Sequence, residues 1–151
     1  MPDQNDAMRT YVASGAASGI GAATTTLLRE QGHRVITVDL RDADVTADLS
    51  SPEGRRDAVA GVRALTEVVH GVVPAAGISG FTGTDPALVV SVNFFGAVAL
   101  VEGLREPLTA ADGSGVVFLA SNSITGQPGW AGEVATACLS GDETAARSAA
   151  V

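Results

Sequence analysis

Short apolar runs rich in β-branched residues alternate with helix-length segments along most of the chain. The runs predict strands, because β-branched side chains pack well on a pleated sheet and each run ends near a turn-forming or acidic residue. The expected strands cover residues 9–13, 34–38, 68–74 and 115–120. Strands joined through helices run parallel in a sheet that is buried on both faces. The alternation therefore predicts an α/β fold with a doubly wound parallel sheet of the Rossmann type.

Three segments between these strands predict helices. The first covers residues 20–32, ends at a glycine and has one apolar face, made of Ile20, Ala23, Leu27 and Leu28. The second begins after Ser50 or Ser51 with a proline and an acid, and its apolar face is Ala58, Val62 and Leu65. The third begins at Asp85-Pro86 and extends to about Arg105. Its 14-residue apolar stretch is too short to span a membrane, so we expect a buried helix.

Length and composition are those of one globular domain covering residues 1–151, with 46% apolar and 17% charged residues. The net charge of −8 argues against nucleic acid or an anionic membrane as partner. A single cysteine, Cys138, and a polar first segment predict a cytoplasmic protein, and His33 and His70 lack the partners of a metal site. Residues 126–151 are rich in alanine and predict surface helices without an obvious core.

Three glycines lie within Ser14–Gly21, SGAASGIG, between the first strand and the first helix. At this place in a βαβ unit, Gly15 would permit a tight turn and Gly19 would let the backbone approach a pyrophosphate. Gly21 would let the helix pack closely on the strand. The alternative is a structural turn that binds nothing.

Asp39 follows the second strand and favours the binding interpretation. A carboxylate there can accept hydrogen bonds from a ribose 2′-hydroxyl and would repel a 2′-phosphate. We therefore predict NAD(H) in preference to NADP(H), although Arg41 is close in sequence. The alternative is an aspartate that is merely solvated at a strand end.

Taken together, these motifs resemble the short-chain dehydrogenase/reductase family. The family's T-G-x-x-x-G-x-G turn matches Ser14–Gly21 with serine for threonine, its adenine-contacting pair resembles Asp48-Leu49, and its N-N-A-G stretch matches residues 74–77. Pro74 has no N–H for a ladder, so it is expected at the end of the strand. The resemblance implies strand order 3-2-1-4-5. The cofactor-binding residues implied by the turn and the resemblance are Gly15, Ser18, Gly19, Ile20, Gly21, Asp39, Leu40, Asp48, Leu49, Ala75, Ala76 and Gly77.

The resemblance also implies two catalytic residues. Asn93 matches the asparagine of a V-N-x-x-G setting, and an amide inside such an apolar helix is costly unless it is hydrogen-bonded. Ser121 closes the strand at 115–120, which is the fifth strand in the order that the resemblance implies, with Ser123 as the second choice. Residues 39–56 and 91–97 are similar to the branch of 3α-hydroxysteroid dehydrogenases and carbonyl reductases.

The Y-x-x-x-K motif that supplies the family's proton-transfer tyrosine does not occur. The chain contains no lysine, and its one tyrosine, Tyr11, lies in the first strand. We therefore expect a chain cut short before that helix, with a sheet incomplete at its C-terminal end. The resemblance implies an NAD(H)-dependent oxidoreductase that acts on a small alcohol or carbonyl compound, steroid-like among others, as a homo-oligomer. The alternative is a catalytically dead dinucleotide-binding module.

Overall fold

The computed structural model describes residues 7–80, 82–121 and 131–151. One parallel sheet is formed by β1 (Thr10–Ser14), β2 (Arg34–Asp39), β3 (Val45–Thr46), β4 (Gly71–Pro74) and β5 (Gly115–Val116). Its order is β3-β2-β1-β4-β5, which confirms the predicted Rossmann-type arrangement. Pro74 ends β4, as its missing N–H requires.

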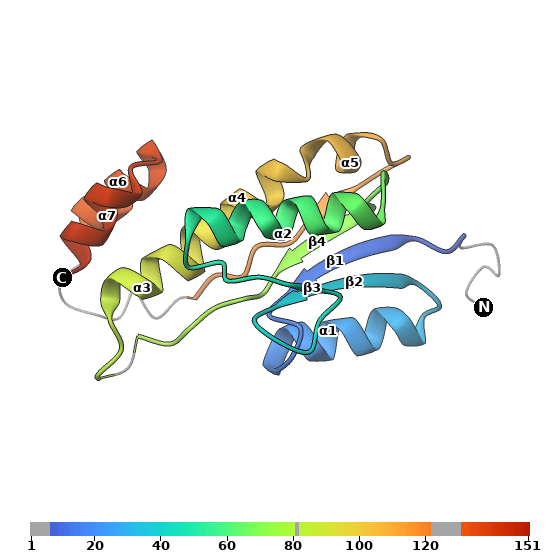
Figure 1. Ribbon diagram of the computed structural model, residues 1–151, viewed down its shortest axis with the longest axis horizontal. Helices are drawn as coiled ribbons and strands as arrows, with labels where there is room; N and C mark the ends of the chain where they lie inside the picture. The colour runs from blue at the N-terminus through green and yellow to red at the C-terminus, as the bar shows by residue number, and fades with distance from the viewer. Residues whose placement is uncertain (1–6, 81, 122–130) are drawn as a thin grey trace.

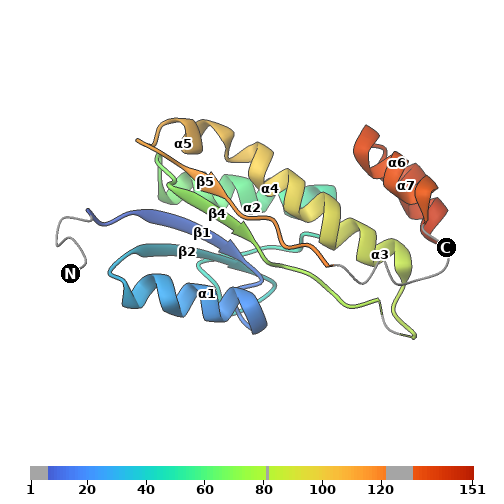
Figure 2. The ribbon, with the colours of Figure 1, turned by 180° about the vertical axis from the view of Figure 1, so that it is seen from behind.

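Helices lie on both faces of the sheet (Figures 1 and 2). The helix α1 (Gly19–Glu30) covers one face, and α2 (Pro52–Leu65) lies on the other with α4 (Ala97–Gly103) and α5 (Arg105–Thr109). The α4 helix continues α3 (Pro86–Val90) through a π-helical turn, η1 (Ser91–Gly96). The predicted caps are present, because Ser51 accepts from the Gly54 N–H and Asp85 accepts from the Ala87 N–H.

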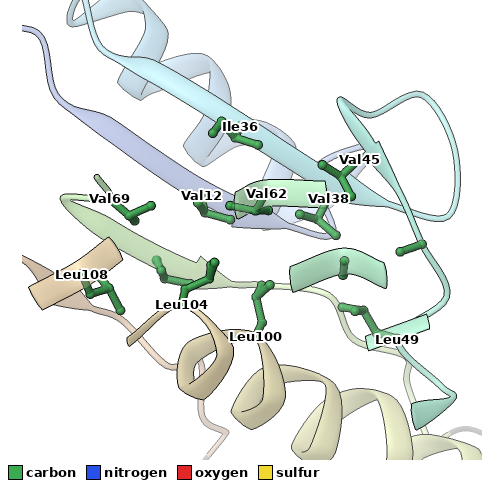
Figure 3. Packing of buried hydrophobic residues seen from close by; sticks show 13 residues of the cluster. Val12, Ile36, Val38, Val45, Leu49, Val62, Val69, Leu100, Leu104 and Leu108 are labelled. Carbon is green, nitrogen blue, oxygen red and sulfur yellow. The ribbon is translucent and has the colours of Figure 1, made fainter. Parts of the chain in front are cut away.

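The main core lies between the sheet and the helices α2, α4 and α5 (Figure 3). Alternate residues of each central strand point into it, as the two-residue period of a strand requires. Its buried members are Val12, Ile36, Val38, Val45, Ala47, Leu49, Ala58, Val62, Val69, Val72, Leu100, Leu104 and Leu108. Leu65, predicted on the buried face of α2, is 43% exposed because it ends the helix.

The buried face of α1 is not the predicted one. Ile20 and Leu27 are 61% and 55% exposed, whereas Gly21 and Thr25 are buried. A Cβ on Gly21 would overlap the carbonyl oxygen of Gly15, and Thr25 bonds its hydroxyl back to the Gly21 carbonyl at 2.8 Å. The helix therefore approaches β1 through its small residues, which an analysis of apolar periodicity overlooks.

The short connection between β2 and β3 is held by hydrogen bonds between Thr37 and Asp44, which we call the Thr37–Asp44 clip. Asp44 Oδ2 accepts from both the N–H and the hydroxyl of Thr37, at 2.9 and 2.8 Å, and the Asp44 N–H donates to that hydroxyl at 2.9 Å. The connection is tight enough to place Asp42 at a φ of 52°, in the left-handed region. The clip holds the short β3 beside the end of β2, where Asp39 pairs with Thr46.

The fifth strand is shorter than predicted. Residues 115–120 were expected to form it, but the ladder covers only Gly115 and Val116, with one further bond from the Val117 N–H to the Val72 carbonyl. Its partner β4 has only four residues, and no strand pairs with β5 on its other side among the described residues. Val117, Phe118 and Leu119 are consequently 57%, 54% and 46% exposed. Among the described residues, the sheet thus ends at an exposed apolar edge.

The helices α6 (Gly132–Ser140) and α7 (Glu143–Ala150) lie beside α3 at one end of the molecule (Figures 1 and 2). The expectation that this segment has no core is wrong. Ala137, Cys138 and Ala146 are buried against partly buried residues of α3, η1 and α6, which are Val90, Phe94, Phe95 and Val134. Small alanines let α7 approach α3 closely.

Among the described residues, one helical stretch, Pro86–Gly103, is long and apolar enough to cross a membrane, with a mean hydropathy of 1.6. The expectation that this segment is too short to span and is buried is therefore wrong, because the helix has 18 residues and 28% of it is buried. Core helices of soluble proteins meet the same test of length and composition. In this fold the stretch contacts α2, β4 and α7.

Candidate functional site

A cavity of about 670 Å³ opens where β1, β2 and β4 end. Ligands of open α/β sheets bind at this edge, and the volume is typical of small-molecule sites. Every predicted cofactor residue except Gly21 lines the cavity. These residues are Gly15, Ser18, Gly19, Ile20, Asp39, Leu40, Asp48, Leu49, Ala75, Ala76 and Gly77. The fold thus brings together residues from four separate segments, and their role in binding stays a prediction.

The three glycines of the turn have different structural roles. A Cβ on Gly15 would lie 2.7 Å from the Ala76 backbone, and one on Gly21 would overlap the Gly15 carbonyl. A Cβ on Gly19 would meet nothing within 4 Å, although Gly19 also has a positive φ of 55°. Gly15 and Gly21 therefore allow close packing, whereas Gly19 leaves open space at the cavity.

The N-terminus of α1 is left without a side-chain partner. Ser18 is its N-cap residue, yet among the described residues no side chain caps its free N–H groups and no acid lies in its first turn. The helices α2 and α7 differ, because each has both a side-chain cap and an acid there. Uncapped N–H groups and the positive end of a helix dipole together favour an anion.

Asp39 reaches across from β2 to the glycine turn. Its Oδ2 accepts from the Ala17 N–H at 3.0 Å and its Oδ1 from the Leu40 N–H at 2.7 Å. An ionised carboxylate has about four acceptor positions, so two remain for a ligand. The side chain is therefore held at the cavity by the backbone on both sides.

The remaining predicted residues form two further walls. Asp48 is exposed and Leu49 is buried in the core, so that only part of Leu49 faces the cavity. The opposite wall, residues 75–77, is tied to β1 because Ser14 Oγ accepts from the Ala76 N–H at 3.1 Å. The serine that replaces the family's threonine thus joins the glycine turn to the β4 loop.

Six residues that line the cavity were not predicted from the sequence. The unpredicted residues are Ala47, Ser50, Ile78, Ser79, Leu88 and Val92. The four-residue spacing of Leu88 and Val92 puts both on one helix face, but the sequence does not tell which face meets the cavity. Ala47 and Ser50 flank the predicted pair at 48–49, so their position in the sequence could have indicated that they also line the cavity.

Asn93 makes two side-chain hydrogen bonds although it is exposed, so the cost of burial is not what requires them. Its Oδ1 accepts from the Ile78 N–H at 2.8 Å and its Nδ2 donates to the Ile78 carbonyl at 2.9 Å. The amide therefore binds the backbone of a residue that lines the cavity.

The other predicted catalytic residue, Ser121, is exposed and is not among the residues that line this cavity. The second choice, Ser123, lies outside the described residues. Tyr11 packs its ring on His33, with centroids 5.3 Å apart, on the β1 segment that precedes the turn. Among the described residues no group of His, Cys, Asp or Glu is arranged to hold a metal ion.

The sequence model of a family described as short chain dehydrogenase matches residues 9–136. The chain belongs to the short-chain dehydrogenase family. A relative from this family, the 3-alpha-hydroxysteroid dehydrogenase/carbonyl reductase of Comamonas testosteroni, is 41% identical over 115 residues, or 76% of this chain and 44% of the relative. A coniferyl-alcohol dehydrogenase of a Pseudomonas species is also 41% identical, over 64% of this chain and 38% of its own length.

A solved short-chain dehydrogenase structure supports the same assignment. The 3-alpha-hydroxysteroid dehydrogenase of Pseudomonas sp. B-0831, complexed with NADH, superposes with a TM-score of 0.86 and 44% identity, covering 93% of this chain and 56% of that one. The chain therefore spans about half the length of the short-chain dehydrogenases it matches.

Proposed function

We propose that this chain forms the dinucleotide-binding part of an NAD(H)-dependent oxidoreductase that acts on a small alcohol or carbonyl compound. The observation that carries the proposal is the uncapped N-terminus of α1, which faces a cavity beside the open space at Gly19. A pyrophosphate fits that place, because backbone N–H groups and a helix dipole bind it without a cationic side chain.

Each part of the dinucleotide has residues suited to it. The N-terminal N–H groups of α1 would bind the pyrophosphate, Asp39 the adenosine ribose, and Asp48 with Leu49 the adenine. Ala75, Ala76 and Gly77 would form the wall behind it. When bound, the nicotinamide ring supplies or accepts the hydride.

NAD(H) is favoured over NADP(H) in this proposal. The Asp39 carboxylate is fixed by two backbone N–H groups, so it cannot turn away from a 2′-phosphate without losing both bonds. The presence of NADH in the related 3-alpha-hydroxysteroid dehydrogenase structure supports the same preference.

The chain's own contribution to the chemical step is limited to positioning. Asn93 holds Ile78 at the cavity wall, and Ser121 is proposed to hold the substrate oxygen. The two relatives are named as dehydrogenases of a hydroxysteroid and of coniferyl alcohol, which supports an alcohol or carbonyl compound as substrate. No lysine occurs in these 151 residues, and Tyr11 lies in β1 against His33. General acid–base catalysis contributes roughly 10²–10⁴-fold, so this chain alone should turn over very slowly.

The uncapped N-terminus of α1 at the cavity also favours a second function, that of a dinucleotide-binding module without catalysis. The two functions share the cavity and differ only in turnover.

Calorimetric titration with NADH and NADPH tests the proposal. We expect NADH to bind more tightly, and Asp39→Asn to narrow the difference because it removes the charge that repels the 2′-phosphate. Tighter or equal binding of NADPH by the unmutated chain would refute the NAD(H) preference, and binding of neither would refute the dinucleotide site. Carbonyl reduction at an ordinary dehydrogenase rate would exclude the module without catalysis.

A further inference from the structure

Helix α3 and the π-helical turn η1 have two faces with different neighbours. Leu88 and Val92 line the cavity on one face, and Asn93 beside them bonds the backbone of Ile78. The other face contacts α7, where Ser91 is completely buried. A shift of this helix would therefore move the cavity wall.

The contact with α7 is a hydrogen-bond network centred on Ser91. The Ser91 hydroxyl donates to Glu143 Oε1 at 2.7 Å and accepts from Arg147 Nη1 at 2.6 Å. Arg147 Nη1 also donates to the Ala87 carbonyl at 3.1 Å. Glu143 and Arg147 of α7 are thus hydrogen-bonded to one turn of the helix that forms the cavity wall.

Arg55 adds α2 to this network. Its side chain is only 6% exposed, and its Nη1 donates to the Ser91 carbonyl and to Glu143 Oε1, each at 3.2 Å. Its Nη2 also pairs with Glu143 Oε2. A buried arginine requires a compensating charge, and Glu143 supplies it from a position 88 residues further along the chain.

The Glu143 carboxylate therefore joins three elements. Burial raises the pKa of this carboxyl, but hydrogen bonds from Arg55 and Ser91 and the charges of Arg55 and Arg147 outweigh burial, so the net pKa is lowered. The group stays ionised at neutral pH, which the pairing with Arg55 requires.

We infer that Glu143 is a positioning residue for the dinucleotide site, which holds helix α3–η1 and its cavity wall in place although Glu143 lies outside that cavity. The inference rests on the proposed function for its ligand. Its mechanical part, the link from Glu143 through Ser91 and Asn93 to Ile78, is measurable without any ligand.

The variant Glu143→Gln tests this inference, because it keeps the side-chain length and one carbonyl oxygen but removes the charge that pairs with Arg55. We expect hydrogen exchange of the Ile78 amide to become faster in the ligand-free chain, since that N–H bonds Asn93. We also expect the dissociation constant of NADH, measured by calorimetry well below the unfolding transition, to rise about tenfold.

Glu106→Gln is the matched control. Glu106 pairs with Arg63 and so also ties α2 to a neighbouring helix, but it is exposed and lies outside the cavity. We expect this variant to leave both the Ile78 exchange and the NADH affinity unchanged. Ser91→Ala is a milder second variant, because it removes the hydroxyl and leaves the Arg55–Glu143 pair. It should change both measurements in the same direction, and add little when combined with Glu143→Gln.

Ile78 exchange that is the same in Glu143→Gln as in the control would overturn the inference, whether or not NADH binds. Faster Ile78 exchange with unchanged NADH affinity would overturn its ligand part. Failure of the unmutated chain to bind NADH would instead overturn the proposed function, and the Ile78 measurement would still decide the mechanical link. If Glu143→Gln does not fold, Ser91→Ala decides by the same two measurements.

Discussion

Gly19 and Gly32 offer a matched pair of substitutions for the proposed phosphate site. Gly19 is the first residue of α1, and Gly32 follows two residues after its last. They have φ values of 55° and 84°, and each has open space where a Cβ would lie. Gly19 lines the cavity, whereas Gly32 lies beyond the other end of a 12-residue helix, about 18 Å away at 1.5 Å per residue. Gly19→Ala and Gly32→Ala therefore impose a similar backbone strain at two places, only one of which faces the ligand.

The expected magnitudes separate stability from binding. A non-glycine residue in the left-handed region costs about 1–2 kcal/mol, so both variants should lose about that much unfolding free energy. At Gly19 the methyl group would also occupy space that a phosphate needs. Loss of one hydrogen bond to a charged group costs about 1.5–3 kcal/mol, which weakens binding roughly 10- to 100-fold. Alanine is the better choice than valine, because a β-branched residue is a stronger outlier at positive φ.

Urea unfolding and NADH calorimetry on the two variants provide the assay. We expect similar unfolding free energies for both, with weakened binding confined to Gly19→Ala. Equal loss of affinity in Gly32→Ala would show that strain in α1, and not the space at Gly19, controls binding. Unchanged affinity in Gly19→Ala would show that the glycine serves the turn alone.

Three further predictions concern stability and association. The pKa values of Asp44 and Glu143 are lowered in the folded chain from 3.8 and 4.5, so in acid the unfolded chain binds more protons than the folded chain. The urea concentration at the unfolding midpoint should therefore stay constant from pH 7 to about 5 and fall at lower pH. A midpoint that stays constant down to pH 3 would contradict this prediction. Asp44→Ala should cost about 1–3 kcal/mol in urea unfolding, because it leaves the buried Thr37 donors without their acceptor, and a loss below about 0.5 kcal/mol would show that water replaces the clip. The exposed Phe118 should promote self-association in a sedimentation concentration series. Because burying a phenylalanine contributes about 1.5–3 kcal/mol, Phe118→Asp should weaken this association roughly 10- to 100-fold, and an unmutated monomer at all concentrations would refute the prediction.

Most of the fold and much of the candidate site could be predicted because their signals are local. A β-branched run, a serine before Pro52 or an aspartate before Pro86 acts through its own few residues, and the structure has the caps that these signals imply. The strand order, which the structure also has, was implied by the resemblance to the family. The glycine turn was also recognisable, because close approach of two backbones demands glycine wherever it occurs.

Other features depended on distances between elements that no local pattern contains. Apolar periodicity chose the wrong face of α1, because contact with β1 is governed by the missing side chain of Gly21. Likewise, the sequence marked Asn93 as a polar group in need of a partner, but only the crossover from β4 to α3 determines that the partner is Ile78.

The sequence by itself determined which residue types stand at the carboxyl edge of a parallel sheet, because turn chemistry follows from short stretches of chain. Tertiary structure decided which of those residues face open space and which are buried. It also paired Arg55 with Glu143 across 88 residues, which neither residue's neighbours indicate. The physical reason is that a buried charge is compensated by whatever acid the packing of helices brings within hydrogen-bond distance, and that packing is a property of the whole domain.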